Sequence, residues 1–153
     1  MNRGIFIALL SIFFAQGLKI PLHYLKTRKV KPALFFQTGG MPSSHSAGVA
    51  SLTTFVALKR GLSTIDFALS FIFGLIVMYD AQGIRRQTGE LTLKVNSLDE
   101  LVNKAHRHES MEFEEKQPER LKEMLGHKPE EVVGGAVFGV VTGLIGYLLS
   151  KKR

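Results

Sequence analysis

The stretch from Val132 to Ser150, VVGGAVFGVVTGLIGYLLS, restricts the fold more than any other feature, because it contains no charged side chain. About 20 consecutive apolar residues let an α-helix cross the hydrocarbon core of a bilayer, so we expect a membrane helix here. Gly135, Gly139 and Gly143 recur every four residues and share one face of that helix. This spacing lets membrane helices approach closely, although glycine is also common in membrane helices generally. We expect this face to pack against another helix, either within the chain or in a homodimer.

Three further apolar segments precede this one. Gly4–Leu22 and Ile65–Ala81 have the length and composition of membrane helices. The first follows Arg3, as in a signal peptide, but no small-x-small cleavage site leads into a mature start, so we expect a retained helix. Ala47–Leu58 reaches roughly 16 residues if its helix begins near Pro42, short of the ~20 that span a bilayer. We expect that helix to be lined by protein, tilted or only partly inserted.

A polar region at residues 82–128 separates the last two apolar segments. Its apolar residues recur at helical spacing and predict an amphipathic helix: Leu91, Val95, Leu98, Val102 and Ala105. The stretch that follows, HRHESMEFEEKQPER, carries mixed charge and is typical of a loop. The predicted fold class is all-α: an integral membrane helical bundle with about four membrane segments, forming one domain over residues 1–153.

The chain is basic, with a formal net charge of +7 at pH 7. Such a charge suits nucleic acid, an anionic membrane surface or a phosphorylated molecule. We expect no nucleic-acid partner, because the cations flank apolar segments and no aromatic stacking platform accompanies them. The absence of cysteine excludes disulfides and thiolate zinc sites.

The distribution of cations also predicts the topology. With four spans, the basic loop at residues 26–31 and the polar region at residues 82–128 lie on one side of the membrane. The positive-inside rule places that side in the cytoplasm, although the basic tail Lys151–Arg153 opposes this assignment. We expect a multi-pass protein of the cell membrane, with the polar motifs described next on the cytoplasmic side.

The first polar motif is GGMPSSHS, residues 39–46. Gly40 permits close backbone approach, and Ser43 and Ser44 suit the start of a helix. Free N–H groups and the positive dipole end make such a start a binding site for phosphate. His45 can donate a proton or a hydrogen bond there. An ordinary helix cap with an incidental histidine is the alternative.

A second motif, GHKPEEV, has the same organisation around a proline at an expected helix start. His127 and Glu131 are four residues apart, so one helical turn brings them together. A carboxylate that accepts one imidazole N–H fixes the tautomer and makes the other ring nitrogen more nucleophilic. The alternative is a helix cap with surface charge.

The third motif, YDAQGIRR, ends an apolar segment. Arg85 and Arg86 suit a phosphate clamp, and Asp80 is placed to orient one of them. Arginines at a membrane boundary also serve as headgroup anchors, which is the alternative. Two histidines, a carboxylate, arginines and anion-binding helix starts on one side of the membrane together indicate phosphoryl transfer.

These motifs resemble those of a known superfamily. The segment MPSSHS resembles the Pro-Ser-Gly-His motif of type 2 phosphatidic acid phosphatases and vanadium-dependent haloperoxidases. The segment GHKPEEV resembles their Gly-x-His-x-x-x-Asp-Val motif, with Glu131 in place of the aspartate. The ordered trio GGMPSSHSA, MYDAQGIRR and LGHKPEEVVGG is similar to a divergent bacterial and plant branch, and the resemblance extends from Lys19 to about Gly143.

The resemblance implies a role for each matching residue. His127 corresponds to the nucleophile that forms a phosphohistidine, Glu131 to the acid that orients it, and His45 to the acid that protonates the departing alcohol. The substrate phosphate is expected to be bound by Ser43, Ser44, Gly40, Arg85, Arg86, Lys19 and Lys26. The superfamily hydrolyses phosphate esters without a metal, so we expect no metal and no cofactor.

Two departures from the superfamily pattern leave a choice of functions. The Lys-x6-Arg-Pro motif is absent, with Lys19 and Lys26 as loose substitutes, and Leu121 stands where an arginine is expected six residues before His127. Our expectation is a hydrolase that removes phosphate from a lipid phosphate or pyrophosphate of polyprenyl or phosphatidyl type. The alternative is an inactive phosphatase-like membrane protein that binds an anionic headgroup or a protein partner.

Overall fold

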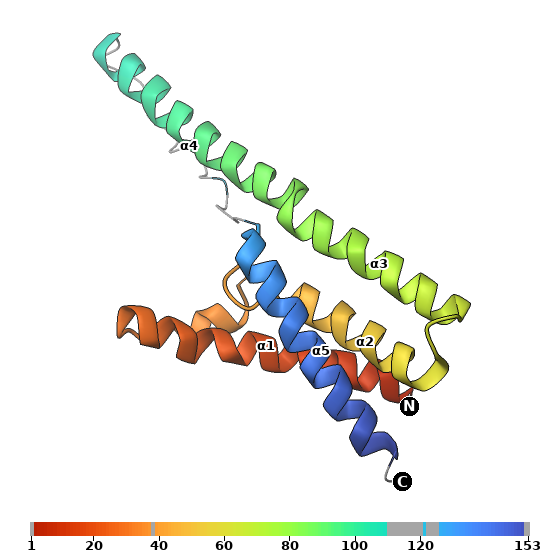
Figure 1. Cartoon of the computed structure of the whole chain (residues 1–153). Helices are drawn as coiled ribbons and strands as arrows, with labels where there is room; N and C mark the ends of the chain where they lie inside the picture. The colour runs from red at the N-terminus through yellow and green to blue at the C-terminus, as the bar shows by residue number, and fades with distance from the viewer. Residues whose placement is uncertain (1, 38, 110–120, 122–125, 152–153) are drawn as a thin grey trace.

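The computed structural model describes residues 2–37, 39–109, 121 and 126–151, and these residues form helices with no strand among them (Figure 1). The helices are α1 (Arg3–Thr27), the short 3-10 helix η1 (Pro32–Phe35), α2 (Ser44–Arg60), α3 (Ile65–Gln82), α4 (Ile84–Glu109) and α5 (Pro129–Lys151). The predicted all-α fold class is confirmed.

Local sequence accounts for the helix starts. The Ser43 side chain caps α2 by accepting from the backbone N–H of Ser46, and Thr64 caps α3 in the same way. Helix α5 begins at Pro129, as the sequence predicted, with two glutamates in its first turn. A side-chain cap or a pre-set proline therefore fixes the points at which these three helices begin.

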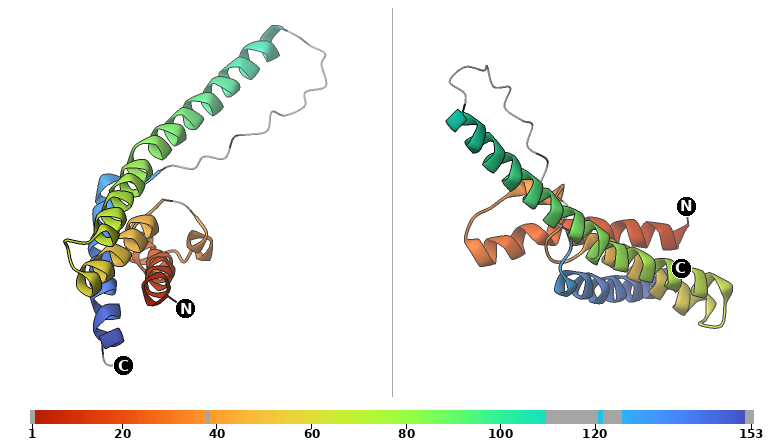
Figure 2. Two further views of the ribbon diagram at one scale, coloured as in Figure 1. Left: turned by 90° about the vertical axis from the view of Figure 1, so that its right-hand side faces the viewer. Right: turned by 90° about the horizontal axis from the view of Figure 1, so that it is seen from above.

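Helix α2 lies at the centre of the bundle and contacts α1, α3 and α5 (Figure 2). Its inward positions are small or apolar, and Ala47, Gly48, Ala50, Ser51 and Phe55 are buried. A helix of 17 residues is short for a membrane span. The expectation that this short helix is lined by protein is confirmed, because its neighbours cover it.

The glycines of α5 form the contact with α2. A Cβ atom added at Gly135, Gly139 or Gly143 would lie under 3.0 Å from a backbone carbonyl oxygen of α2 or its cap, a separation that real Cβ atoms essentially never show. These positions are therefore restricted to glycine by the close approach of the two helices. The sequence predicted that this glycine face packs either against a helix of the same chain or against a second copy. In the structure it packs against α2 of the same chain. Dimerisation stays a prediction.

Among the described residues, three helical segments are long and apolar enough to cross a membrane: Arg3–Thr27, Ile65–Lys104 and Pro129–Lys151. Large apolar side chains such as Phe14, Ile72 and Leu148 are exposed on these segments, as lipid-facing residues are. The sequence predicted about four membrane segments. The structure contains these three, with the shorter α2 enclosed between them.

The polar region at residues 82–128 contains the predicted amphipathic helix, which is α4. Helix α4 continues α3 almost in line and projects away from the rest of the bundle (Figures 1 and 2). The helix runs on to Glu109, so residues 106–109 are helical rather than part of the expected mixed-charge loop. Residues 110–120 of that loop lie outside the described residues.

Candidate functional site

The packing of α2 against α5 brings the two histidine motifs to one end of the bundle. Gly135 lies against Ser43, Gly139 against Ala47 and Gly143 against Ser51, so the two helices run in the same direction. Their amino-terminal ends therefore lie side by side. Both ends carry the positive pole of a helix dipole, which favours an anion. At the start of α5, however, the N–H groups of Glu131 and Val132 already donate to the carbonyl oxygen of Lys128, and Glu130 and Glu131 add negative charge.

The start of α2 is a network of buried serines. Ser43, Ser44 and Ser46 are almost completely buried. The Ser43 Oγ accepts from the backbone N–H of Ser46 at 3.3 Å and from the Ser46 hydroxyl at 3.1 Å. The Ser43 backbone N–H donates to the carbonyl oxygen of Glu131 at 2.9 Å, which ties the start of α2 directly to the first turn of α5.

His127 is held by its backbone and by its ring. The side chain is only 3% exposed, and the backbone N–H donates to the carbonyl oxygen of Ala81 at the end of α3, at 3.0 Å. Nδ1 lies 3.0 Å from Oε2 of Glu131, which also accepts from the backbone N–H of Lys128 at 3.2 Å. The predicted His127–Glu131 contact is therefore present. In the tautomer whose Nδ1–H donates to this carboxylate, Nε2 is the nitrogen suited to nucleophilic attack.

The His45 ring lies edge-to-face against the His127 ring, where the starts of α2 and α5 meet. The ring centroids are 5.8 Å apart, with an interplanar angle of 71°. His45 is half-buried in the first turn of α2. Two imidazoles this close together are able to act on one phosphoryl group, one as nucleophile and the other as proton donor.

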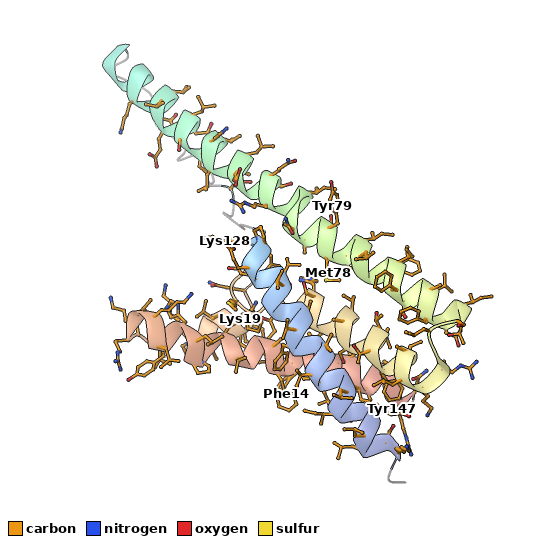
Figure 3. All side chains as sticks on the ribbon, in the orientation of Figure 1. Phe14, Lys19, Met78, Tyr79, Lys128 and Tyr147 are labelled. Carbon is orange, nitrogen blue, oxygen red and sulfur yellow. The ribbon has the colours of Figure 1, made fainter. Side chains whose placement is uncertain are left out.

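A cavity of about 200 Å³ opens beside Glu131. It brings together several residues that the sequence predicted for phosphate binding, and it is lined by Lys19, Leu22, His23, Lys26, Leu34, Gly40, Met41 and Glu131. Lys19 is 3% exposed, and its Nζ donates to the carbonyl oxygen of Gln37 at 3.1 Å. In Figure 3, Lys19 lies near the start of α5, below Lys128.

Gly40 has a backbone reason to be glycine in this cavity. Its φ of +83° lies in the left-handed region, which side chains disfavour. A Cβ at this position would be 3.8 Å from Cδ of Lys19, so the loop backbone runs directly over the buried lysine stem. The positive φ favours glycine at position 40, whereas its predicted close approach to a bound phosphate stays a prediction.

Arg86, one of the residues predicted from the third motif, is engaged outside the histidine cluster. Its Nε bonds Oε1 of Glu90 at 3.1 Å along α4, and the two side chains are 42% and 54% exposed. The Arg85 side chain lies outside the described part of the structure. Asp80 is half-buried and precedes Ala81, the residue that accepts from His127. The arginine clamp and the orienting role of Asp80 stay predictions.

Two backbone anchors of the site were missed by the sequence reasoning. The first is the Ala81–His127 bond, which carries no side-chain signal. The second is Asn96, which is 4% exposed: its Nδ2 donates to the carbonyl oxygen of Leu121 at 3.0 Å, and its Oδ1 accepts from the Leu121 N–H at 3.1 Å. The sequence feature that could have identified Asn96 is its position: it lies on the side of α4 away from the apolar residues Leu91, Val95, Leu98 and Val102.

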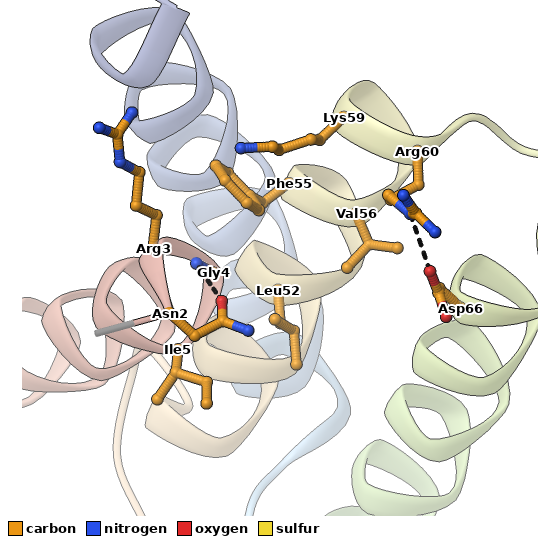
Figure 4. A pocket seen from close by; sticks show the side chains of 10 residues that line it. All are labelled: Asn2, Arg3, Gly4, Ile5, Leu52, Phe55, Val56, Lys59, Arg60 and Asp66. Atoms are coloured by element: carbon orange, nitrogen blue, oxygen red, sulfur yellow. Dashed lines mark hydrogen bonds and ion pairs between the residues drawn. The ribbon is translucent and has the colours of Figure 1, made fainter. Parts of the chain in front are cut away.

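A second cavity, of about 610 Å³, lies at the other end of α1 and α2 (Figure 4). Its charged residues are Arg3, Lys59, Arg60 and Asp66. Arg60 Nε bonds Asp66 Oδ2 at 2.9 Å, with the side chains 64% and 55% exposed. Charged side chains therefore cluster at this end of the bundle too, but the Arg60–Asp66 pair is exposed to solvent.

The sequence is similar to a known protein family and to a bacterial membrane protein. A family described as "Divergent PAP2 family" matches residues 1–142. A Bacillus subtilis (strain 168) protein with the name "Uncharacterized membrane protein YuiD" is 43% identical over 148 residues, which cover 94% of this chain and 93% of that protein. No solved structure matches the chain. The family match extends over the whole histidine end of the bundle.

Proposed function

The chain belongs to the Divergent PAP2 family, and from this premise we propose that it is a membrane phosphatase acting on a lipid phosphate or pyrophosphate. One observation carries the proposal: the buried His127, bonded to Glu131, faces His45 between two helix starts. Burial of this many polar groups is costly unless they bond one another, and such clusters are typical of catalytic sites.

In the first step, Nε2 of His127 attacks phosphorus. A P–N bond forms while the P–O bond to the lipid alcohol breaks, and the alcohol oxygen takes its proton from His45. Glu131 holds the Nδ1 proton and stabilises the imidazole as positive charge develops on it. For a pyrophosphate substrate the leaving group is the lipid monophosphate.

In the second step, water attacks the phosphohistidine. His45, which lost its proton in the first step, accepts one from this water, and the P–N bond breaks to release inorganic phosphate and restore His127. The charge on the phosphoryl oxygens is balanced by the N–H groups and dipole at the start of α2, by the hydroxyls of Ser43 and Ser44, and by the ammonium of Lys19.

The cavity beside Glu131, whose lining includes neither His45 nor His127, suits the headgroup end of a lipid. Its lysines, Lys19 and Lys26, suit the phosphate, whereas Leu22, Leu34 and Met41 suit the first carbons of an apolar chain. Polyprenyl and phosphatidyl chains both satisfy these requirements. From the distribution of cations we place the reaction on the cytoplasmic side of the cell membrane.

Phosphate release tests the proposal. Purified protein in detergent is offered phosphatidate and a polyprenyl pyrophosphate, beside the His127→Ala and His45→Ala variants, with Arg60→Ala as a control at the far end. The wild type and Arg60→Ala should release phosphate from at least one lipid, and both histidine variants should lose that release. No release from either lipid by the wild type would contradict the proposal.

The second candidate is a protein that binds the headgroup without hydrolysing it. It is favoured by Leu121, which stands where the superfamily pattern has an arginine, and by Arg86, which bonds Glu90 instead. Binding of a lipid phosphate by wild type and His127→Ala separates the two candidates. Equal binding without turnover in both proteins supports the binder, and turnover by the wild type alone supports the enzyme.

A further inference from the structure

Helix α4 carries an apolar stripe that the bundle does not cover. Leu91, Val95, Leu98 and Val102 are 61%, 40%, 58% and 50% exposed. They follow one another at spacings of four, three and four residues, so they form one continuous line along the helix. Because α4 projects from the bundle, this line is accessible along its length (Figure 1).

The opposite face of α4 makes contacts within the same chain. Gly89 and Asn96 are buried there, and the Asn96 amide holds the backbone of Leu121 through two hydrogen bonds. Successive residues are about 100° apart around a helix, so these two positions face well away from the apolar stripe. The contact with Leu121 therefore leaves the stripe open to a partner.

The spacing and the residue types of the stripe fit a coiled coil. Val95 and Val102 take the a positions of a heptad, and Leu91 and Leu98 take the d positions. β-Branched residues at a with leucine at d favour a parallel pair of helices over higher oligomers. The pattern therefore fits a parallel helix of the same kind as the partner.

Charge complementarity agrees with this register. Lys94 occupies the g position and Asp99 the following e position, on the two sides of the stripe. Five residues apart, they do not face one another within a single helix, where partners are three or four residues apart. In a parallel pair, however, Lys94 of one helix meets Asp99 of the other, and this contact forms twice.

Membrane insertion supplies the orientation. Helices α3 and α4 form one helical run, Ile65–Lys104, whose first part is apolar enough to cross the bilayer. Two copies inserted with the same topology therefore present their α4 helices in the same direction. Confinement to one membrane also raises the effective concentration of the partners, which helps a short coiled coil. We propose that α4 pairs with α4 of a second copy in a parallel two-stranded coiled coil.

A membrane surface is a poorer occupant of the stripe. Helices that lie on a bilayer are rich in Lys and Arg on their polar face and carry aromatic residues on the other. The sequence of α4 contains no Phe, Tyr or Trp, and its charged residues include acids, among them Glu90, Asp99 and Glu100.

Cysteine cross-linking in native membranes tests the pairing directly, because the chain contains no cysteine of its own. Leu98→Cys, in the seam, is compared with Ser97→Cys, an exposed neighbour that points away from it. In a parallel pair each residue of the seam lies next to its own copy. Mild oxidation should therefore yield at least about tenfold more disulfide-linked dimer from Leu98→Cys, since only there do the Cβ atoms come within bonding range.

A charge exchange tests the register in the Leu98→Cys background. Lys94→Asp should lower the cross-linked fraction by bringing acids together, and adding Asp99→Lys should restore it. Equal cross-linking at positions 97 and 98 would overturn the proposal, as would no dimer from Leu98→Cys. If the thiol of the Leu98→Cys variant were protected from a water-soluble maleimide without any dimer, the stripe would belong to the membrane instead, and the proposal would also be overturned.

Discussion

Charged residues cluster at both ends of the bundle, but they are buried at one end and exposed to solvent at the other. At the histidine end, Lys19, His127 and the serines at the start of α2 are buried. Lys19 donates to the Gln37 carbonyl oxygen, His127 bonds Glu131, and the Ser43 backbone N–H donates to the Glu131 carbonyl oxygen. At the other end, Arg60 and Asp66 form a short ion pair with more than half of each side chain exposed. The same kinds of group are therefore in a nearly dry environment at one end and in a wet one at the other.

The difference in burial indicates which of the two charged clusters is functional. An exposed ion pair contributes only about 0–1 kcal/mol to the free energy of unfolding. Buried polar groups carry a desolvation cost of roughly 1–3 kcal/mol each when a bond is missing, so their arrangement is precise. A chain gains little stability from such a cluster, and the histidine end is therefore the end expected to do chemistry.

Among the variants that keep the His127 nucleophile, the largest effect is expected from His45. His45→Ala should lower the rate of phosphate release by about 10²- to 10⁴-fold, because the leaving alcohol loses its proton donor. The loss should be much smaller for a substrate with an acidic leaving group such as p-nitrophenol, which needs no proton. An equal loss on both substrates would show that His45 has another role. Lys59→Ala, at the far end, is the control and should leave both rates unchanged.

The next effect concerns Glu131. Glu131→Gln keeps the shape of the side chain but removes the charge that holds the Nδ1 proton of His127. Loss of one charge-assisted hydrogen bond of about 1.5–3 kcal/mol predicts a decrease in turnover of about 10- to 100-fold. Unfolding temperatures in detergent check that the fold survives. Unchanged turnover in a folded Glu131→Gln variant would rule out the orienting role.

Glycine substitutions compare the rigidity of the two ends. Gly135→Ala drives a methyl group into the backbone of Ser43, whereas the nearest atoms to the new methyl of Gly146→Ala belong to the side chain of Ile7. We expect Gly135→Ala to destabilise the protein by about 1–3 kcal/mol and Gly146→Ala by less. Gly17→Ala, where nothing lies within 4 Å, is the reference for helix propensity. Thermal unfolding in detergent measures all three, and equal losses at positions 135 and 146 would remove the distinction.

The smallest effect is expected at the solvent-exposed end. Arg60→Gln breaks the ion pair with Asp66, and the free energy of unfolding should fall by less than about 1 kcal/mol. The difference should shrink further in high salt, which screens exposed charges. A loss of several kcal/mol, insensitive to salt, would mean that this end is as specifically built as the other.

The helices and one contact of the site could be predicted from sequence, for local reasons. Hydropathy and the proline start defined α5, and the spacing of four residues gave the His127–Glu131 contact. The glycine spacing indicated a packing face, but the identity of the partner, α2, depends on the tertiary arrangement.

The remainder of the site depends on contacts between distant segments. The approach of His45 to His127 requires α2 and α5 to run in parallel, and no local pattern encodes that. Arg86 bonds Glu90 one helical turn away, a local pairing that the phosphate-clamp prediction leaves out. Asn96 acts on a segment 25 residues away, which sequence periodicity does not reveal.

The central claim is that His127 carries the phosphoryl group, and trapping that intermediate tests it most directly. The protein is mixed with a ³²P-labelled lipid phosphate, and the reaction is quenched in alkali within milliseconds to seconds. Alkali preserves phosphohistidine. The account predicts an acid-labile label on the wild-type protein, none on His127→Ala, and an accumulated label on wild type at low temperature. Label on His127→Ala, or phosphate release by that variant at the wild-type rate, would contradict it.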